Sequence, residues 1–373
     1  MTEDGVPSQL RTAASWSWRI LLLVGVAAVG IWLIIQFRIV VIPFLISTLL
    51  AALLVPFSHW LQRRRWPKWA AVAASMLGAL ALIGGLVTLV VFQIRGGWND
   101  LVEATVSAVD RFGGWLAGPP FNLELRDLRQ SILDGWATLG QDSSTFWSGA
   151  LSVGSTAGHV LAGLLLTLFA MLFLLIDGGR IWRWFLSLFP KRARARTDDA
   201  ARVGWATLTT FTRIQIFVAA IDAVGIGLGA WILGLFFGGF PLVIPIAVVV
   251  FLASFIPIVG ALFSGALAVF VALVYLGPIP AIIMLAIVLL VQQIEGHVLQ
   301  PLVMGGAVKV HPLAVVFGVA AGSLIAGIPG ALFAVPIIAV GNVMIRRLAA
   351  GPQGPVAAVE EDGPAETAEG EAR

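Results

Sequence analysis

The chain of 373 residues contains no cysteine, and charged residues make up only 12% of it. Without cysteine there is no disulfide framework, no thiolate metal site and no cysteine nucleophile. The charged fraction is about half of the ~25% that is usual for a soluble domain. Hydrophobic residues instead make up 59% of the chain. This composition indicates an integral membrane protein.

The scarcity of charge is greatest in the C-terminal part. Residues 214–345 contain only three formally charged side chains, Asp222, Glu295 and Lys309. An ionised group at the centre of a bilayer costs at least ~2.5 kcal/mol, so charges at that depth are few and usually functional. Asp222 lies inside an uninterrupted apolar run. It is therefore the first candidate for a functional residue.

The apolar runs are long enough to cross a bilayer as helices, since ~20 residues at ~1.5 Å each span the hydrocarbon core of ~30 Å. The clear runs are 18–35, 39–57, 69–94, 151–176 and 214–235, and the shorter ones are 242–256, 261–276, 279–294, 313–326 and 329–345. The first run resembles a signal peptide. Because a second apolar run follows it directly, we predict an uncleaved first span.

Two of the shorter runs, 242–256 and 261–276, are separated by Pro257 and Gly260. They are compatible with two thin spans or with one re-entrant hairpin, and we favour the hairpin. Irregular backbone at membrane depth is tolerated only where protein or a water-filled cavity covers it, which makes such a hairpin a pathway element. The predicted fold is all-α, with about eight spans, the re-entrant hairpin and a small external helical cap.

Basic residues set the predicted orientation. The turn after the second run carries Arg63, Arg64, Arg65 and Lys68, and residues 177–213 carry eight basic and three acidic side chains. The positive-inside rule places these segments and both termini in the cytoplasm. The loop 95–150, with seven acidic and four basic residues, is then external. Nucleic acid is not a predicted partner.

The sequence thus predicts seven regions. They are a cytoplasmic tail (1–17), three spans (18–94), an external loop with two amphipathic helices (95–150), a fourth span (151–176), a basic amphipathic cytoplasmic segment (177–213), a core with broken helices (214–345) and a disordered acidic tail (346–373). The basic segment is expected to meet anionic lipid headgroups. The tail cannot bury a hydrophobic core, because it consists largely of Pro, Gly, Ala and Glu.

Asp222 is open to two interpretations. It could be a neutral acid that hydrogen-bonds a neighbouring helix, since burial favours the uncharged form of a carboxyl group. Alternatively, it could line a cavity and exchange a proton or cation during a conformational change. Gly225 and Gly229, and likewise Gly318 with Gly322 and Gly154 with Gly158, form pairs of small residues that favour close helix packing.

A second candidate site is the polar run Gln292, Gln293, Ile294, Glu295, Gly296, His297, Val298, Leu299, Gln300, Pro301. Gly296 permits an unwound backbone and Pro301 prevents a simple helix through it. Exposed carbonyl groups and Glu295 could ligate a cation. Alternatively, Glu295 and the glutamines satisfy backbone groups at the cytoplasmic end of a helix. The spacing of Glu295, His297 and His311 matches no metal motif, and we predict no metal and no cofactor.

Sequence signatures of enzymes are missing as well. There is no HExxH motif, no GxSxG elbow and no Walker loop. An aspartyl intramembrane protease needs two membrane acids, and this chain has one convincing candidate. We therefore predict that the protein is not an enzyme.

The C-terminal third carries a series of motifs. They are Arg213-Ile-Gln215, Phe255-Ile-Pro257-Ile-Val-Gly260, the stretch QQIEGHVLQPLVMG from Gln292 to Gly305, His311-Pro312, Gly327-Ile-Pro-Gly330 and Ala334-Val-Pro336. Together they resemble the autoinducer-2 exporter family over residues 200–345. Gly265, Ala307 and Pro329 depart from the family pattern. The resemblance implies a bacterial inner-membrane protein of about eight spans, a homo-oligomer and outward transport of small molecules. The substrates described for the family are furanone-type quorum signals, or sodium and lithium ions exchanged for protons.

The sequence leads to the prediction of a permease for a small polar solute or a cation. Alternatives are a sodium(lithium)/proton antiporter, a passive pore and a non-transporting scaffold. Candidate transport or coupling residues are Asp222, Glu295, Gln292, Gln293, Arg213 and Gln215. Candidate hinge residues are Pro257, Gly260, Gly296, Pro301, Gly305, Pro312, Gly327, Gly330 and Pro336. The lipid bilayer, the solute and further copies of the chain are the expected partners.

Overall fold

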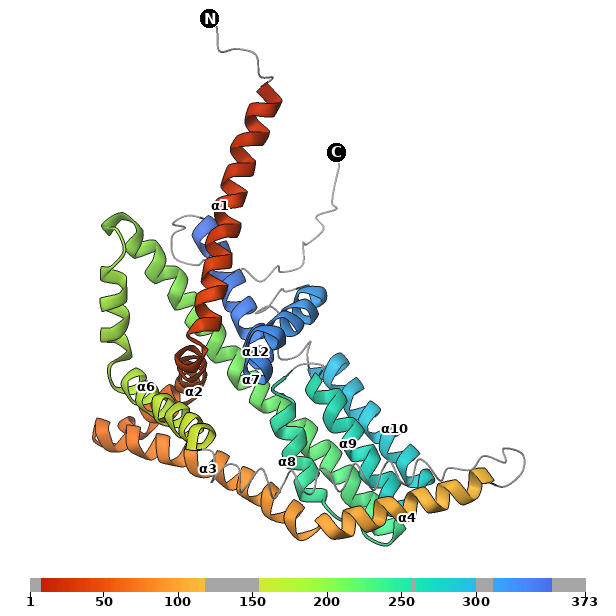
Figure 1. Ribbon diagram of the computed structural model, residues 1–373. Coiled ribbons are helices and arrows are strands. Elements are labelled where there is room, and N and C mark those ends of the chain that lie inside the picture. The colour runs from red at the N-terminus through yellow and green to blue at the C-terminus, as the bar shows by residue number, and fades with distance from the viewer. Residues whose placement is uncertain (1–7, 118–153, 257–258, 300–310, 351–373) are drawn as a thin grey trace, which may run out of the picture.

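The computed structural model describes residues 8–117, 154–256, 259–299 and 311–350, whose regular structure is entirely helical (Figure 1). The helices are α1 (Ser8–Gln36), α2 (Arg38–Arg63), α3 (Lys68–Gly96), α4 (Trp98–Ala117), α6 (Gly154–Ser187), α7 (Lys191–Phe237), α8 (Val243–Ala253), α9 (Val259–Leu276), α10 (Pro278–Ile294), the π-helical turn η1 (Glu295–Leu299) and α12 (Pro312–Ala349). The predicted all-α membrane fold is confirmed.

Helix α7 is the central element and runs diagonally through the molecule (Figure 1). Its 47 residues extend about 70 Å at ~1.5 Å per residue, more than twice the thickness of a bilayer core. The sequence predicted a separate segment up to residue 213 and a span from 214, but the structure joins them. No proline interrupts the helix between Lys191 and Phe237. It ends at Gly238, which adopts the left-handed conformation at φ +92°.

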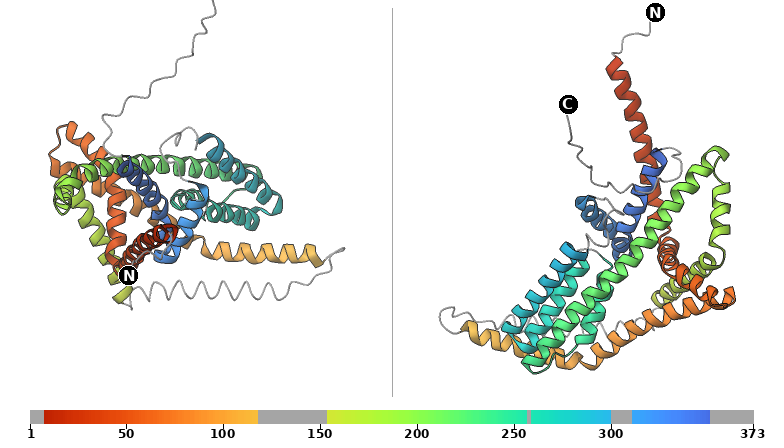
Figure 2. Two further views of the ribbon diagram at one scale, coloured as in Figure 1. Left: turned by 90° about the horizontal axis from the view of Figure 1, so that it is seen from above. Right: turned by 180° about the vertical axis from the view of Figure 1, so that it is seen from behind.

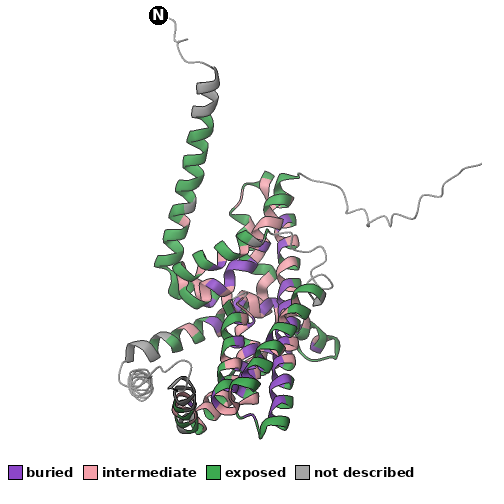
Figure 3. Cartoon of the chain, turned by 90° about the vertical axis from the view of Figure 1, so that its right-hand side faces the viewer, coloured by how far each residue is buried: buried purple, intermediate pink, exposed green. Residues whose placement is uncertain are grey.

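The other helices form three groups around α7. Helices α8, α9 and α10 pack beside its C-terminal half, and α12 packs along its N-terminal half. Helices α2, α3 and α6 form the third group, in which α6 kinks at Asp177, where φ is −125°. Helix α1 extends away from them, and the side chains of its large apolar residues from Trp16 onward are exposed (Figure 3). Lipid is the expected cover for its apolar side chains.

The segment predicted as a re-entrant hairpin consists of α8 and α9, which lie side by side (Figures 1 and 2). Helix α8 has 11 residues and is about 16 Å long, half of what a ~30 Å core requires. It is therefore too short to cross the membrane, as expected of a re-entrant arm. Between the arms, Gly260 lies directly against the carbonyl oxygen of Ala253, and a β-carbon would have no room there. This position needs glycine.

A second hairpin lies inside α12. Ala326 and Gly327 leave the helical conformation, and Gly327 has a φ of +63°, which favours glycine. The two arms then fold back on each other, so that the backbone of Gly322 contacts the backbone of Gly330. The runs predicted at 313–326 and 329–345 are thus two arms that meet at this turn.

Eight helices in the described part of the chain are long and apolar enough to cross a membrane, which agrees with the predicted number. The set differs in composition from the predicted one. Helix α9 qualifies with 18 residues, and the two arms of α12 are counted together as one segment of 37 residues. The sequence had assigned α9 to the re-entrant hairpin and counted the arms of α12 separately.

Helix α4 corresponds to the first of the two amphipathic helices predicted for the external loop, and it packs on α9. The second one, expected around residues 125–139, lies outside the described residues. Hydrophobic burial is concentrated where α7, α8, α9 and α10 meet (Figure 3). A smaller cluster joins Phe211 of α7 to Val319 and Ala334 of α12, and Ile256, just after α8, packs against it. The turn of the first hairpin therefore reaches the contact between α7 and α12.

Close helix contacts depend on the glycines named in the sequence. A β-carbon at Gly225 would lie 3.0 Å from Cγ2 of Val291, and one at Gly229 would collide with Ile287, so α10 packs directly on this face of α7. The close packing expected for both glycines is confirmed, as it is for Gly318, which lies against Ile338. A β-carbon added to Gly158 would meet no atom within 4 Å, so the described residues show no close helix contact there.

We expect Gly229→Ala to lower the stability of the protein in detergent, because the added methyl group must displace the β-branched side chain of Ile287. Overpacking of this kind costs about 1–3 kcal/mol. Thermal unfolding followed by circular dichroism measures the effect. Gly163→Ala, in open space on α6, is the matched control. An equal melting temperature for both variants would show that Gly229 and Ile287 are not in close contact.

Candidate functional site

Asp222 lies on the face of α7 that points into the protein and is only 2% exposed. The neighbouring Val224, at 58% exposure, is on the outer face of the same helix. Oδ2 of Asp222 accepts a hydrogen bond from Oγ of Ser254 at 3.2 Å. Oδ1 is buried without a hydrogen-bond partner among the described residues. A carboxyl oxygen left in this state is costly, which makes Asp222 a candidate functional residue.

Ser254 follows the last residue of α8, and it connects the hairpin to α7 in two ways. Its hydroxyl group lies beside Asp222, and its carbonyl oxygen accepts a hydrogen bond of 2.7 Å from Nε2 of Gln215. Gln215 is buried and lies two helical turns before Asp222 on the same face of α7. The glutamine thus satisfies one of the carbonyl groups that the end of α8 leaves without an intrahelical partner.

Glu295 approaches the same site from the end of α10. Because Val291 and Ile287 pack against Gly225 and Gly229, the end of α10 is held at the level of Asp222. Glu295 is half-buried there, and its carboxyl group interacts electrostatically with that of Asp222. The sequence predicted an unwound backbone at Gly296, but the structure continues as a π-helical turn from Glu295 to Leu299. Such wide turns are rare and occur often at functional sites.

Not every predicted residue joins this group. Arg213 is exposed on the opposite face of α7 from Gln215. Gln292 is half-buried and Gln293 is exposed, and the carbonyl oxygen of Gln293 lies 3.3 Å from Nδ1 of His297. No set of three or more His, Asp or Glu residues that could hold a metal ion occurs in the described ranges.

The predicted hinge residues occupy different places. Gly260 lies at the α8–α9 turn, Gly296 in η1, and Gly327 and Gly330 at the turn of α12. Pro312 begins α12 after the cap residue His311, whose Nδ1 accepts a hydrogen bond from the backbone of Leu313, and Pro336 lies inside the second arm. Pro257, Pro301 and Gly305 lie outside the described residues.

Sequence reasoning did not identify Ser254, although a signal was present. It is the one polar side chain in the apolar run 242–256, three residues before Pro257. A lone hydroxyl group in an apolar run is usually satisfied by its own helix. What distinguishes Ser254 is Asp222, which is 32 residues away in the chain and beside it in space.

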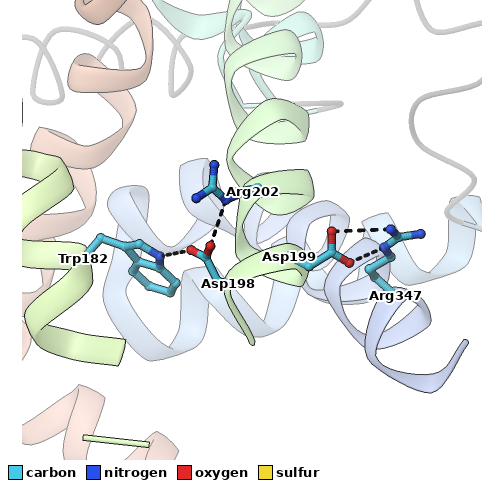
Figure 4. A network of polar contacts seen from close by, with 5 residues as sticks. All are labelled: Trp182, Asp198, Asp199, Arg202 and Arg347. Carbon is cyan, nitrogen blue, oxygen red and sulfur yellow. Dashed lines mark hydrogen bonds and ion pairs between the residues drawn. The ribbon is translucent and has the colours of Figure 1, made fainter. Parts of the chain in front are cut away.

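A separate polar network connects three helices at the N-terminal end of α7 (Figure 4). The indole nitrogen of Trp182 on α6 donates to Oδ1 of Asp198 at 2.7 Å, and Nε of Arg202 donates to Oδ2 of the same carboxyl group at 2.9 Å. Beside it, Arg347 near the end of α12 forms an ion pair with Asp199. Exposed ion pairs contribute little stability individually, so this network links α6, α7 and α12 without adding much to their stability.

Helices that can cross a membrane, two helical hairpins and a buried, incompletely bonded carboxyl group between them are features of a polytopic transport protein. The family model described as AI-2E family transporter matches residues 20–350, and the chain belongs to this family. The resemblance noted in the sequence is therefore confirmed.

Similar proteins carry names of the same kind. "Putative transport protein MT0215" of Mycobacterium tuberculosis is 37% identical over 363 residues, which cover 97% of this chain and 98% of that protein. "Putative transport protein YrrI" of Bacillus subtilis is 26% identical over 331 residues, with 84% of this chain and 87% of the relative covered. "Putative transport protein YueF" of the same organism is 24% identical and covers 80% and 81%. The protein is a multi-pass membrane transporter.

Proposed function

We propose that this transporter moves a small polar solute or a cation across the bacterial inner membrane, and that protonation of Asp222 is coupled to the movement. The observation that supports this proposal most directly is the side chain of Asp222, which is 2% exposed and has one oxygen without a hydrogen-bond partner among the described residues. A charge at membrane depth costs at least ~2.5 kcal/mol and is retained where it has a function.

The surroundings of Asp222 favour alternating access. At the turn of the α8–α9 hairpin, Ser254 bonds to Asp222, and Ile256 packs where α7 meets α12. A movement of the hairpin would therefore change the environment of the acid. In this structure the acid is closed to solvent, which corresponds to an occluded state. A permanently open pore would leave it hydrated, so the burial argues against the passive pore. A scaffold would have no use for an incompletely bonded buried acid.

A sodium or lithium ion exchanged for protons is the second candidate. The observation that favours it is the packing of α10 on Gly225 and Gly229, which brings Glu295 to the level of Asp222 and so places two carboxyl groups in one site. Hard cations bind to carboxylate and carbonyl oxygens. Export of a quorum-sensing signal instead follows from the family resemblance alone. The positive-inside rule further supports cytoplasmic termini, and a homo-oligomer is proposed from the same resemblance.

A thermal-shift experiment on the purified full-length protein tests the proposal. A ligand that binds only the folded form raises the apparent stability, by about 2.7 kcal/mol at a hundred times its Kd. We expect sodium chloride, lithium chloride or one of a panel of small polar solutes to raise the melting temperature of the wild type, and to have less effect on Asp222→Asn. Potassium chloride at equal ionic strength is the control. Channel-like conductance in planar bilayers would contradict an alternating-access transporter and support a passive pore.

A further inference from the structure

The hydroxyl group of Ser254 has two acceptors within reach and one hydrogen to donate. Oγ lies 2.8 Å from the carbonyl oxygen of Val250, one helical turn back in α8, and 3.2 Å from Oδ2 of Asp222. A serine hydroxyl can donate to only one of them at a time, and its oxygen can accept a further bond. Which acceptor receives the hydrogen therefore depends on whether Asp222 has a proton of its own.

Both protonation states of Asp222 have a satisfactory arrangement. When the carboxyl group is ionised it can only accept, so the hydroxyl of Ser254 donates to Oδ2. When the carboxyl group is protonated, it can donate to Oγ of Ser254, and the hydroxyl hydrogen turns back to the carbonyl oxygen of Val250. Hydrogen bonds to an ionised group are about twice as strong as those between neutral groups. The end of α8 is therefore held more tightly to α7 when Asp222 is ionised.

We propose that Ser254 is a positioning residue through which the proton on Asp222 controls the attachment of the α8–α9 hairpin to α7. This inference rests on the proposed coupling role of Asp222. Gln215 provides a constant part of the attachment, because its bond to the carbonyl oxygen of Ser254 does not depend on the proton. Ser254 provides the variable part. Loss of the proton tightens the hairpin, and gain of the proton loosens it.

Few other charged groups face this contact. Helices α8, α9 and α10 contain no Asp, Glu, Lys, Arg or His in their described residues, and Tyr275 of α9 interacts with Asp100 of α4 instead. Glu295 in η1 is the acid that interacts with Asp222. Arg213 of α7 is exposed on the other face, and Arg346 and Arg347 lie at the far end of α12, near Asp199. His297 in η1 is exposed, and so are the Lys, Arg and His residues of α2 and α3, which pack on α7 and α8. The buried or half-buried candidates for a titration of the hairpin are therefore Asp222 and Glu295, and variants can separate them.

Amide hydrogen exchange measures the attachment without knowledge of the substrate. Suitable reporters are the amides of Ser254, Ile256 and Gly260, which donate to the carbonyl oxygens of Val250, Ala253 and Ile256. The full-length protein is placed in lipid nanodiscs, and the labelling times are scaled to cancel the intrinsic pH dependence of exchange. In the wild type we expect protection of these amides to fall about tenfold as the pH decreases through the titration, the scale of a hydrogen bond to a charged group.

The variants make the experiment decisive. Ser254→Ala and Asp222→Asn are each expected to show low protection at every pH. Gln215→Ala should lower the protection at every pH but keep the transition, and Glu295→Gln should keep it as well. Ser264→Ala is the matched control, because Ser264 is buried in the same hairpin and its hydroxyl donates only to the carbonyl oxygen of Ala261.

A full transition in Ser254→Ala would overturn the role of Ser254 while leaving Asp222 as the coupling residue. A transition that survives in Asp222→Asn and disappears in Glu295→Gln would overturn the inference as a whole, since the titrating group would then be Glu295. The absence of any transition in the wild type would also overturn it. The proposed function is judged separately, by ligand binding and by flux, so each of the two can fail without the other.

Discussion

Proteoliposomes that contain Asp222→Asn are expected to show no proton movement above that of protein-free liposomes, although the variant is inserted and folded. Asparagine has nearly the same shape as aspartate and can still accept a hydrogen bond from Ser254, but it cannot gain or lose a proton in the accessible pH range. The packing around 2% exposed Asp222 therefore stays the same, while the titration is removed. A pH-sensitive dye inside the vesicles reports the movement after a pulse of sodium or lithium chloride or of a candidate solute.

Asp199→Asn is the matched control for this experiment. Asp199 lies on the same helix, and its ion pair with Arg347 is partly exposed, so its removal should leave the flux within about twofold of wild type. Equal melting temperatures of wild type and Asp222→Asn would show that the variant is folded. Wild-type proton movement in Asp222→Asn would contradict the coupling role and leave the acid with a structural one.

Replacement of Gly330 by alanine is expected to produce a large loss of stability for a single added methyl group. A β-carbon at this position would collide with the carbonyl group of Gly322, and that group belongs to the backbone and cannot turn away. The two arms of α12 must separate to admit it, which breaks the hairpin and its packing on Phe211. The cost should exceed the ~1–3 kcal/mol of ordinary overpacking, so we expect poor expression or loss of the folded protein in detergent.

Gly341→Ala provides the comparison, because Gly341 lies in the second arm of the same helix and a β-carbon added to it would meet no atom within 4 Å. Size-exclusion chromatography and thermal unfolding distinguish the variants. If Gly330→Ala were as stable as Gly341→Ala, the arms of α12 would not be in contact, and α12 would not form a hairpin.

The two hairpins suggest how movement could be shared between parts of the transporter. Helix α7 belongs to both halves of the core, with α12 on its first half and α8 to α10 on its second. The turn of the first hairpin lies where the halves meet, close to Asp222, Gln215 and Ile256. The contact of Gly204 with Met344 and the packing of Phe211 against α12 hold α12 to α7. We therefore expect α8 and α9 to move and α12 to stay with α7.

Sequence reasoning was strong where a single physical requirement decides the outcome. In lipid every backbone group must be satisfied within the protein, so long apolar runs become helices regardless of their neighbours. This requirement accounts for the correct fold class and number of spans. Breaks caused by glycine were also visible, since Gly260 and Gly327 lie at turns in the structure. The continuity of α7 across residue 213 was missed, because the change from basic to apolar side chains resembled a helix boundary. No proline ends the helix at that point.

The candidate site shows the same division. The sequence marked Asp222 because a charge in an apolar run is rare, and it marked Glu295 as an acid in a polar run at the end of a span. Gln215 was marked through the family resemblance. It also included Arg213 and Gln293, which the structure leaves exposed and away from the acid, and it omitted Ser254. Composition and order along the chain determined that this is a helical membrane transporter with a buried acid. Only the tertiary structure decided which side chains surround that acid, because hydrogen bonds between residues 32 or 39 positions apart depend on how the helices pack.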